Sequence, residues 1–353
     1  MYRKLIALLW PITLASELIA GQNASSTLTS STIPSTTTEP VYDCPAAEEI
    51  SPCSCHLLGK NQMEMDCSNV QSGDELGRVF STEFELSDFV RLIIAGNYNL
   101  TTLREGDLGV SSFKEIYIMN GILVEIEDLA LVGSTDTLEY LDLYNNNLQT
   151  MPAISTFSRL SGVNLCGNYI TEFPALNSMT LKNLDFIENP LVSLPSDAFQ
   201  GLPAVEYVFL DRCNLEEIAS GTFANNQKLS YLSLDGNNLR SLPLDAIQLS
   251  GIKSYLFLQN NQLGQLASGS ISGVTGIIYM NGNSLTELNE HVFRPMLENN
   301  ADVYLADNPF GCGCDIAWLI LNQTLLDGLA DSPSCEDGTF FVDLDPAYYE
   351  AMC

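Results

Sequence analysis

Apolar and polar residues alternate in a characteristic order in the middle of the chain. In residues 138–151, LEYLDLYNNNLQTM, four leucines and Asn146 stand in the spacing LxxLxLxxNxL. Leu141 and Leu143 flank a polar residue, the period of a strand with one buried face, so their neighbours point outward. The pattern predicts a short strand and then a turn. We expect the Asn side chain at that turn to bond backbone groups that strand pairing leaves unpaired.

The same unit recurs along the chain at intervals of 21 to 25 residues. The positions equivalent to Asn146 are Asn97, Gly121, Asn146, Asn168, Asn189, Cys213, Asn237, Asn261, Asn283 and Asn308. One unit cannot bury its apolar face alone, whereas stacked units bury a continuous core. The sequence therefore predicts an α/β solenoid, a leucine-rich-repeat horseshoe of about ten repeats. Its concave side is a parallel β-sheet, its convex side is irregular or short-helical, and both ends are capped.

The segments that return between strands contain a second recurrent position. Phe199, Phe223 and Phe293 each follow the Asn position of their repeat by ten residues. We expect the three rings to stack as an aromatic spine that holds the convex wall, and not to bind a ligand.

The first 42 residues precede the repeats. Residues 1–21 have basic residues at the start, an apolar run and small residues at the end, which is typical of a secretory signal peptide. Residues 22–42 form a linker, in which 11 of the 14 residues from 25 to 38 are Ser or Thr. This composition suits O-glycosylation, and it suits an unmodified tail equally well. No later apolar run has the length of a membrane span, so we expect a soluble, extracellular protein. The sequons predict N-glycosylation at Asn23, Asn99 and Asn322.

Charge narrows the choice of partner. The 353 residues include 44 Asp and Glu but 14 Lys and Arg, a formal net charge of −30. Nucleic acid is excluded as a partner because the sequence offers no basic stripe to phosphates. A protein with a basic surface is favoured. The alternative is that the acidic residues only keep the protein in solution.

Eight of the ten cysteines lie in two groups of four at the ends of the repeats. They define an amino-terminal cap with the segment leading into the repeats (residues 43–88), the repeats (89–308) and a carboxy-terminal cap (309–353). A metal site is disfavoured by the CxC spacing and by the two histidines of the chain, so the groups predict disulfides. The ends of a solenoid expose core and strand edge, and short caps need such crosslinks. Cys213, at an Asn position, should be a buried thiol. Cys166 should face the concave side, and the two cysteines should not form a disulfide with each other.

No arrangement of residues predicts catalysis. His56 falls in the amino-terminal cap and His291 on the convex side, and neither accompanies an activated nucleophile. Phosphate-binding glycine loops and metalloprotease motifs are missing from the sequence as well. We therefore expect a protein that is not an enzyme and that needs no cofactor and no metal.

The cap sequences carry a family resemblance. CPAAEEISPCSC, MDCSN, FKEIYI and NPFGCGCDIAWLI are similar to the secreted leucine-rich-repeat family with cysteine-flanked caps, and within it to an arthropod subgroup that includes a non-catalytic luciferase subunit. The resemblance covers residues 44–353. It implies a protein that holds a partner and has no chemistry of its own. It also implies that cap cysteines pair first to third and second to fourth: Cys44 with Cys55, Cys53 with Cys67, Cys312 with Cys335 and Cys314 with Cys353.

These observations favour a secreted scaffold that binds another protein through its concave face, in the luciferase-type version by stabilising a separate catalytic chain. An extracellular-matrix or adhesion protein and an innate-immune recognition protein are the alternatives. The concave columns predict the contact residues Tyr207, Phe209, Tyr231, Tyr255, Phe257, Tyr279, Tyr304, Asp185, Asp211 and Asp235. An exposed patch of rings is costly unless a partner covers it. The alternative explanation is that aromatic residues suit strands whatever they face.

Overall fold

The computed structural model describes residues 42–250 and 253–353. The signal peptide, nearly all of the linker and the sequon at Asn23 lie outside the described residues. Residues Val41–Cys353 form one compact unit. Within the described ranges, no helix combines the length and the apolar character needed to cross a membrane.

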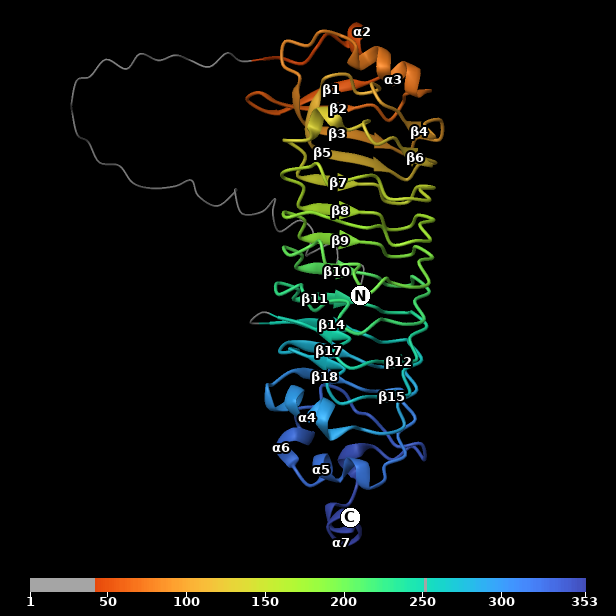
Figure 1. The fold of residues 1–353 in the computed structure, drawn as a ribbon, viewed down its shortest axis with the longest axis vertical. Helices are drawn as coiled ribbons and strands as arrows, with labels where there is room; N and C mark the ends of the chain where they lie inside the picture. The colour runs from red at the N-terminus through yellow and green to blue at the C-terminus, as the bar shows by residue number, and fades with distance from the viewer. Residues whose placement is uncertain (1–41, 251–252) are drawn as a thin grey trace, which may run out of the picture. The chain divides into compact units, whose positions relative to one another are not determined.

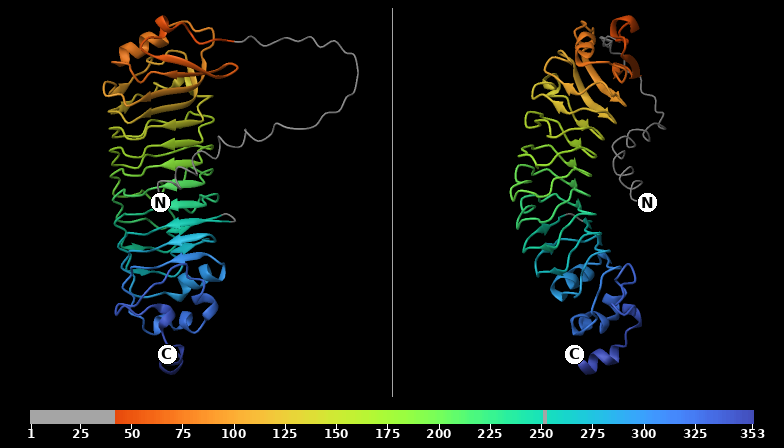
Figure 2. Two further views of the ribbon diagram at one scale, coloured as in Figure 1. Left: turned by 180° about the vertical axis from the view of Figure 1, so that it is seen from behind. Right: turned by 90° about the vertical axis from the view of Figure 1, so that its right-hand side faces the viewer.

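One sheet of twelve strands runs through this unit, and its strands are neighbours in chain order (Figure 1). The strands are β1 (Ser54–Gly59), β2 (Gln62–Asp66), β3 (Asp88–Ala95), β5 (Ser112–Met119), β7 (Tyr140–Asp142), β8 (Gly162–Asn164), β9 (Asn183–Asp185), β10 (Tyr207–Phe209), β11 (Tyr231–Ser233), β14 (Tyr255–Phe257), β17 (Ile277–Tyr279) and β18 (Asp302–Tyr304). β1 and β2 are antiparallel, and each later neighbour pair is parallel. The strands from β3 to β18 correspond to the ten repeats of the sequence, and the predicted solenoid is confirmed. Seen from the side, this stack of turns bends (Figure 2).

The strands pair in register, so equivalent residues of successive repeats stack in columns. Leu141 is the partner of Ile116 on one side and of Val163 on the other, and all three are fully buried. Each turn thus adds apolar side chains to the same interior column. Each Å² of apolar surface that is buried stabilises the fold by about 25 cal/mol, so this shared core is the main source of stability.

The Asn column forms the hydrogen bonds predicted for it. The Asn146 amide donates to Ile118 O at 2.7 Å and to Leu143 O at 3.1 Å, and its Oδ1 accepts from Leu123 N. The same arrangement recurs at the later asparagines of the column, whereas Asn97 in the first repeat donates to Ser68 O and Val70 O of the cap. Cys213 takes this place in its repeat with its Sγ 3.1 Å from Phe186 O, and it is buried as predicted.

The convex side contains short strands, turns and few helices. Three two-stranded sheets join β4 (Thr102–Leu103) to β6 (Glu125–Ile126), β12 (Ser241–Leu242) to β15 (Gln265–Leu266), and β13 (Ile247–Gln248) to β16 (Ile271–Ser272). The helical segments here are η1 (Val132–Ser134) and α4 (Glu290–Glu298).

The aromatic spine of the convex wall is shorter than predicted. Phe199 and Phe223 are in contact, with ring centroids 4.8 Å apart, and Phe173 extends the row at 5.0 Å from Phe199. Phe293 is buried in α4, but the two intervening repeats have Ile247 and Ile271 at the equivalent position. Branched aliphatic side chains therefore continue the column where the rings stop.

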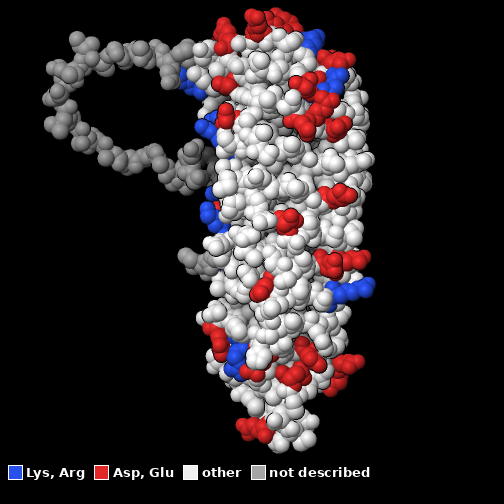
Figure 3. Space-filling view, in the orientation of Figure 1, with Lys and Arg blue, Asp and Glu red and all other residues white. Residues whose placement is uncertain are grey.

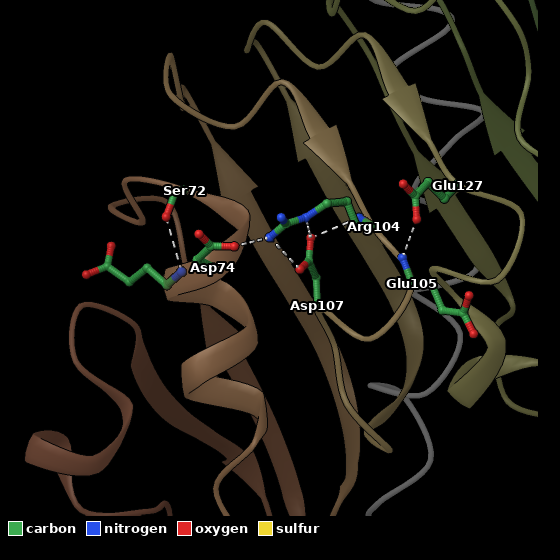
Figure 4. A network of polar contacts seen from close by, with 7 residues as sticks. Ser72, Asp74, Arg104, Glu105, Asp107 and Glu127 are labelled. Atoms are coloured by element: carbon green, nitrogen blue, oxygen red, sulfur yellow. Dashed lines mark hydrogen bonds and ion pairs between the residues drawn. The ribbon is translucent and has the colours of Figure 1, made fainter.

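The amino-terminal cap covers the first turn of the solenoid. It contains α2 (Ala47–Ile50), the hairpin of β1 and β2, and α3 (Gly73–Phe80). Disulfides Cys44–Cys55 and Cys53–Cys67 hold it, as the family resemblance implied. A polar network attaches α3 to the first repeat (Figure 4): Arg104 contacts Asp74 at 2.7 Å and the buried Asp107 at 3.1 Å.

The carboxy-terminal cap closes the opposite edge of the sheet. Its helices are η2 (Cys314–Ile316), α5 (Ala317–Ile320), α6 (Gln323–Leu326), η3 (Phe341–Asp343) and α7 (Pro346–Met352). Disulfides Cys312–Cys335 and Cys314–Cys353 crosslink it, again as implied. The Asp331 carboxylate accepts hydrogen bonds from Leu305 N and Ala306 N at 2.7 to 3.0 Å. Leu305 N is an edge group that an eleventh repeat would otherwise pair, so this side chain takes the place of a strand there.

Candidate protein-binding face

Seven aromatic side chains cover the carboxy-terminal half of the concave sheet. We call this set the aromatic ladder: Tyr207, Phe209, Tyr231, Tyr255, Phe257, Tyr279 and Tyr304. Strand register places Tyr207, Tyr231 and Tyr255 in one row. Neighbouring ring centroids along the ladder are between 4.3 and 6.1 Å apart. At this spacing aromatic pairs gain about 0.5–1.5 kcal/mol beyond burial.

Tyr231 is the centre of the ladder. A second row of the ladder contains Phe209 and Phe257. Between them in strand register lies the small Ser233, which leaves room for the ring of Tyr231. The ring of Tyr231 contacts Phe209 at 5.0 Å and Phe257 at 4.9 Å, as well as both tyrosines of its own row.

The ladder is less exposed than the sequence suggested. Its rings lie outside the interior core, as expected. However, Phe209, Tyr231 and Phe257 are only 1%, 5% and 7% exposed, because the rings cover one another. Tyr207, Tyr255, Tyr279 and Tyr304 are partly exposed. The ladder therefore consists of three supporting rings and four tyrosines that a partner can reach.

The acidic residues of the predicted site are buried, which corrects the expectation of an exposed acidic border. Asp185, Asp211 and Asp235 are 4%, 5% and 9% exposed. Asp185 Oδ1 accepts from Ile187 N at 2.8 Å. Asp211 Oδ1 accepts from the Ser233 hydroxyl and from Asp235 N at 2.9 Å. Short side chains beside a strand bond the backbone of their own and the next turn, and the turns then cover them.

Burial changes the charge of these acids. It raises the pKa of Asp185 to about 8, with additional repulsion from Asp211, Asp142 and Glu188, although the Ile187 N–H works against the shift. It raises the pKa of Asp211 to about 7, with repulsion from Asp235 opposed by the Ser233 hydroxyl and Arg212. These carboxyls therefore titrate near neutral pH, where exposed aspartates are fully ionised.

A group of ion pairs occupies the amino-terminal end of the concave face. Arg91 on β3 lies between Glu64 on β2 and Glu115 on β5, with N–O distances of 2.9 and 2.8 Å. Its guanidinium is also 5.3 Å from the ring centroid of Tyr117, which is 5.6 Å from the ring of Tyr140. The repeat pattern does not reveal this group, because β2 belongs to the cap and lacks a repeat motif. The signal for this group is the alternating charge of the register partners Glu64, Arg91 and Glu115.

Acidic side chains are spread from end to end on the side of the molecule drawn in Figure 3, where Lys and Arg are few. Glu188, which follows the buried Asp185 by three residues, stays exposed and pairs with Arg212 at 2.8 Å.

The two cysteines outside the caps are free thiols, and they form no bridge, as expected. Cys213 is buried and Cys166 is half-buried. Burial raises the pKa of each of the two thiols above the usual range for cysteine. Neither is therefore a reactive nucleophile near neutral pH.

The histidines and sequons fall at separate places. His56 lies on β1 with Nε2 3.4 Å from the Ser54 hydroxyl, and His291 lies exposed on α4. Asn99 is exposed, and Asn322 caps α6 by accepting from Leu325 N. Among the residues that the structure describes, no three His, Cys, Asp or Glu side chains are grouped to bind a metal ion.

Comparison with known proteins agrees with this architecture. Leucine-rich-repeat family models match residues 137–160 and 205–263. A chain from the solved octameric complex of Latrophilin 3, Unc5D and FLRT2 has a TM-score of 0.65 at 22% identity, covering 86% of this chain and 98% of that one. The molecule is thus a leucine-rich-repeat protein by fold.

Sequence relatives narrow the class. The Oplophorus-luciferin 2-monooxygenase non-catalytic subunit of Oplophorus gracilirostris is 38% identical over 316 residues, 88% of each chain. Lumican of Gallus gallus is 26% identical over 156 residues, 43% of each chain. The chain belongs to the leucine-rich-repeat family that includes the Oplophorus non-catalytic subunit, which confirms the resemblance carried by the caps.

Proposed function

We propose that this protein is a secreted scaffold that binds and stabilises a separate catalytic chain. Its 38% identical relative is named as a non-catalytic subunit, and that relative spans nearly the whole chain. Four disulfide-bonded pairs support an oxidising, extracellular setting. The observation that carries the proposal is the aromatic ladder, a continuous apolar surface outside the core.

The four partly exposed tyrosines of the ladder provide the contact in this proposal. Tyrosine is a frequent hot-spot residue because it is large, rigid and able to hydrogen-bond. The buried rings beneath hold these side chains in place, which lowers the entropy cost of binding. The partner offers apolar side chains to the ladder and Lys or Arg to the surrounding acids such as Glu188.

Co-purification from the native secretion tests this function. We expect one enzyme to accompany the protein in a fixed stoichiometry and to lose activity faster on heating once the two are separated. The purified scaffold alone should turn over neither luciferin nor common hydrolase substrates. Recovery of the protein with insoluble matrix and with no enzyme would favour the adhesion alternative. Activity that a single substitution in this chain abolishes would overturn the proposal.

A further inference from the structure

A cleft of about 680 Å³ opens in the carboxy-terminal cap, beside the Cys312–Cys335 disulfide. Its walls include three carboxylate residues, Glu336, Asp337 and Asp345, and two tyrosines, Tyr348 and Tyr349. The tyrosines come from α7, the last helix of the chain (Figure 1). This cleft is built by cap residues and is no part of the aromatic ladder.

Two tyrosine rings form a fixed corner in the cleft. Their centroids are 5.5 Å apart and their planes meet at 89°. Tyr349 is buried, and its hydroxyl donates to Cys312 O at 2.8 Å, so its ring is fixed to the disulfide loop. Tyr348 is 58% exposed and presents its ring to solvent. An exposed tyrosine held against a fixed ring offers a flat, electron-rich surface to a ligand.

The charge of the cleft is uniformly negative. No Lys, Arg or His lines it, and residues 309–353 contain eight acidic residues and no basic one. Asp337 accepts from Thr339 N and Asp345 accepts from Ala347 N, both at 2.9 Å, through one oxygen each. These backbone bonds hold the two carboxylates in place at the cleft. The bond from Thr339 also lowers the pKa of Asp337, which keeps it ionised.

We infer that this cleft binds a basic side chain of a polypeptide, with its guanidinium or ammonium group against the ring of Tyr348 and between the carboxylates. Aromatic faces attract cations, and carboxylates accept hydrogen bonds from them. One such pair already joins the last repeats to this cap, because the Arg294 guanidinium on α4 lies 5.3 Å from the ring centroid of Trp318 in the cap. The cleft is larger than a lone ammonium ion and has space for a side chain with its adjoining backbone.

Peptide titration of the full mature protein tests this inference. The probes are acetylated, amidated pentapeptides with a central arginine, lysine or citrulline between glycines. Their binding is measured by calorimetry at low salt. Citrulline preserves the shape of arginine and removes its charge. We expect the arginine and lysine peptides to bind, and the citrulline peptide to bind about tenfold more weakly or not at all. Equal binding of the citrulline and arginine peptides would overturn the inference.

Substitutions place the site. Tyr348→Ala should weaken the arginine peptide about three- to tenfold, the range of a partly desolvated cation–π contact, and Glu336→Gln should weaken it and flatten its salt dependence. Phe340→Ala and Glu350→Gln are the matched controls, because both residues are exposed in the same cap and neither lines the cleft. Disulfide mapping and thermal melts verify that each variant is folded. Loss of binding in the controls alone, or no loss in the two cleft variants, would contradict the assignment.

A further arm distinguishes the source of the cation. Free argininamide and tetramethylammonium should bind at least about tenfold more weakly than the arginine peptide, because they lack the adjoining backbone. If either binds as tightly as the peptide, the ligand is a small organic cation and the polypeptide assignment is wrong. The cleft variants should not change enzyme co-purification through the ladder, so this inference and the proposed function fail separately.

Discussion

The two halves of the concave face solve the same packing problem with different chemistry. At the amino-terminal end, Arg91 satisfies two glutamates and a tyrosine ring. At the carboxy-terminal end, the rings of two neighbouring rows cover one another, and buried aspartates bond the backbone beside them. A repeat scaffold needs a constant kind of side chain, apolar and of similar size, only in its core columns. The outward columns are free to specialise, and here one half is ionic and the other is apolar.

Removal of the central ring should have the largest effect on this difference. Tyr231→Ala takes away a nearly buried side chain and its four ring contacts, and we expect a loss of about 2–4 kcal/mol in the free energy of unfolding. Tyr255→Ala, in the same row but partly exposed, should cost about 1 kcal/mol. Urea unfolding followed by far-UV circular dichroism measures both. Equal losses in the two variants would mean that Tyr231 does not support the ladder.

Much of this architecture could be predicted from the sequence, because each repeat has the same spacing of apolar and Asn positions. Asn occupies its column in eight of the ten units and apolar residues fill the interior positions of each unit, so a departure in one repeat does not alter the register. The burial of Asp211 was not accessible. The burial of Asp211 depends on contacts between turns. The Ser233 hydroxyl of the next turn donates to its carboxylate, and the ring of Tyr231 in that turn packs against Phe209. The Arg91 group was missed for a related reason, since one of its members lies in the cap.

The buried aspartates should make stability depend on pH in an unusual direction. The folded-state pKa values of Asp185 and Asp211, about 8 and about 7, exceed the usual 3.8, so the folded protein binds more protons than the unfolded chain between those limits. Stability from these groups is therefore present below about pH 4 and is lost as the pH rises through 7 to 8.

Asp185→Asn and Asp211→Asn test this sign. Each should melt higher than wild type at pH 8.5 by about 3 °C or more, with a smaller difference at pH 5. Asp197→Asn is the control, because Asp197 is exposed, and it should shift the melting temperature equally at both values. A variant that is less stable than wild type at pH 8.5 would show that the carboxylates are needed in their ionised form.

The ionic half should respond more weakly, and to salt instead of pH. Arg91→Met leaves Glu64 and Glu115 opposed without a cation, and we expect a loss of about 1 kcal/mol because the ion pairs are only partly buried. The loss should shrink in 0.5 M salt, whereas the cost of Tyr231→Ala should not. A double-mutant cycle with Glu115→Gln isolates the pair. A coupling of zero in that cycle would remove the ionic half of the comparison.

The most direct measurement compares binding by the two halves. Tyr207→Ala with Tyr255→Ala removes two reachable rings of the ladder, and Arg91→Met with Tyr117→Ala alters the ionic half to a similar extent. The affinity of each double variant for the co-purified enzyme is measured by calorimetry, after melts confirm folding. We predict that the ladder variant loses about 2 kcal/mol or more of binding free energy, roughly a thirtyfold weaker Kd, and that the ionic variant loses less than about 0.5 kcal/mol. Wild-type affinity in the ladder variant, or a larger loss in the ionic one, would contradict the ladder as the partner-binding surface.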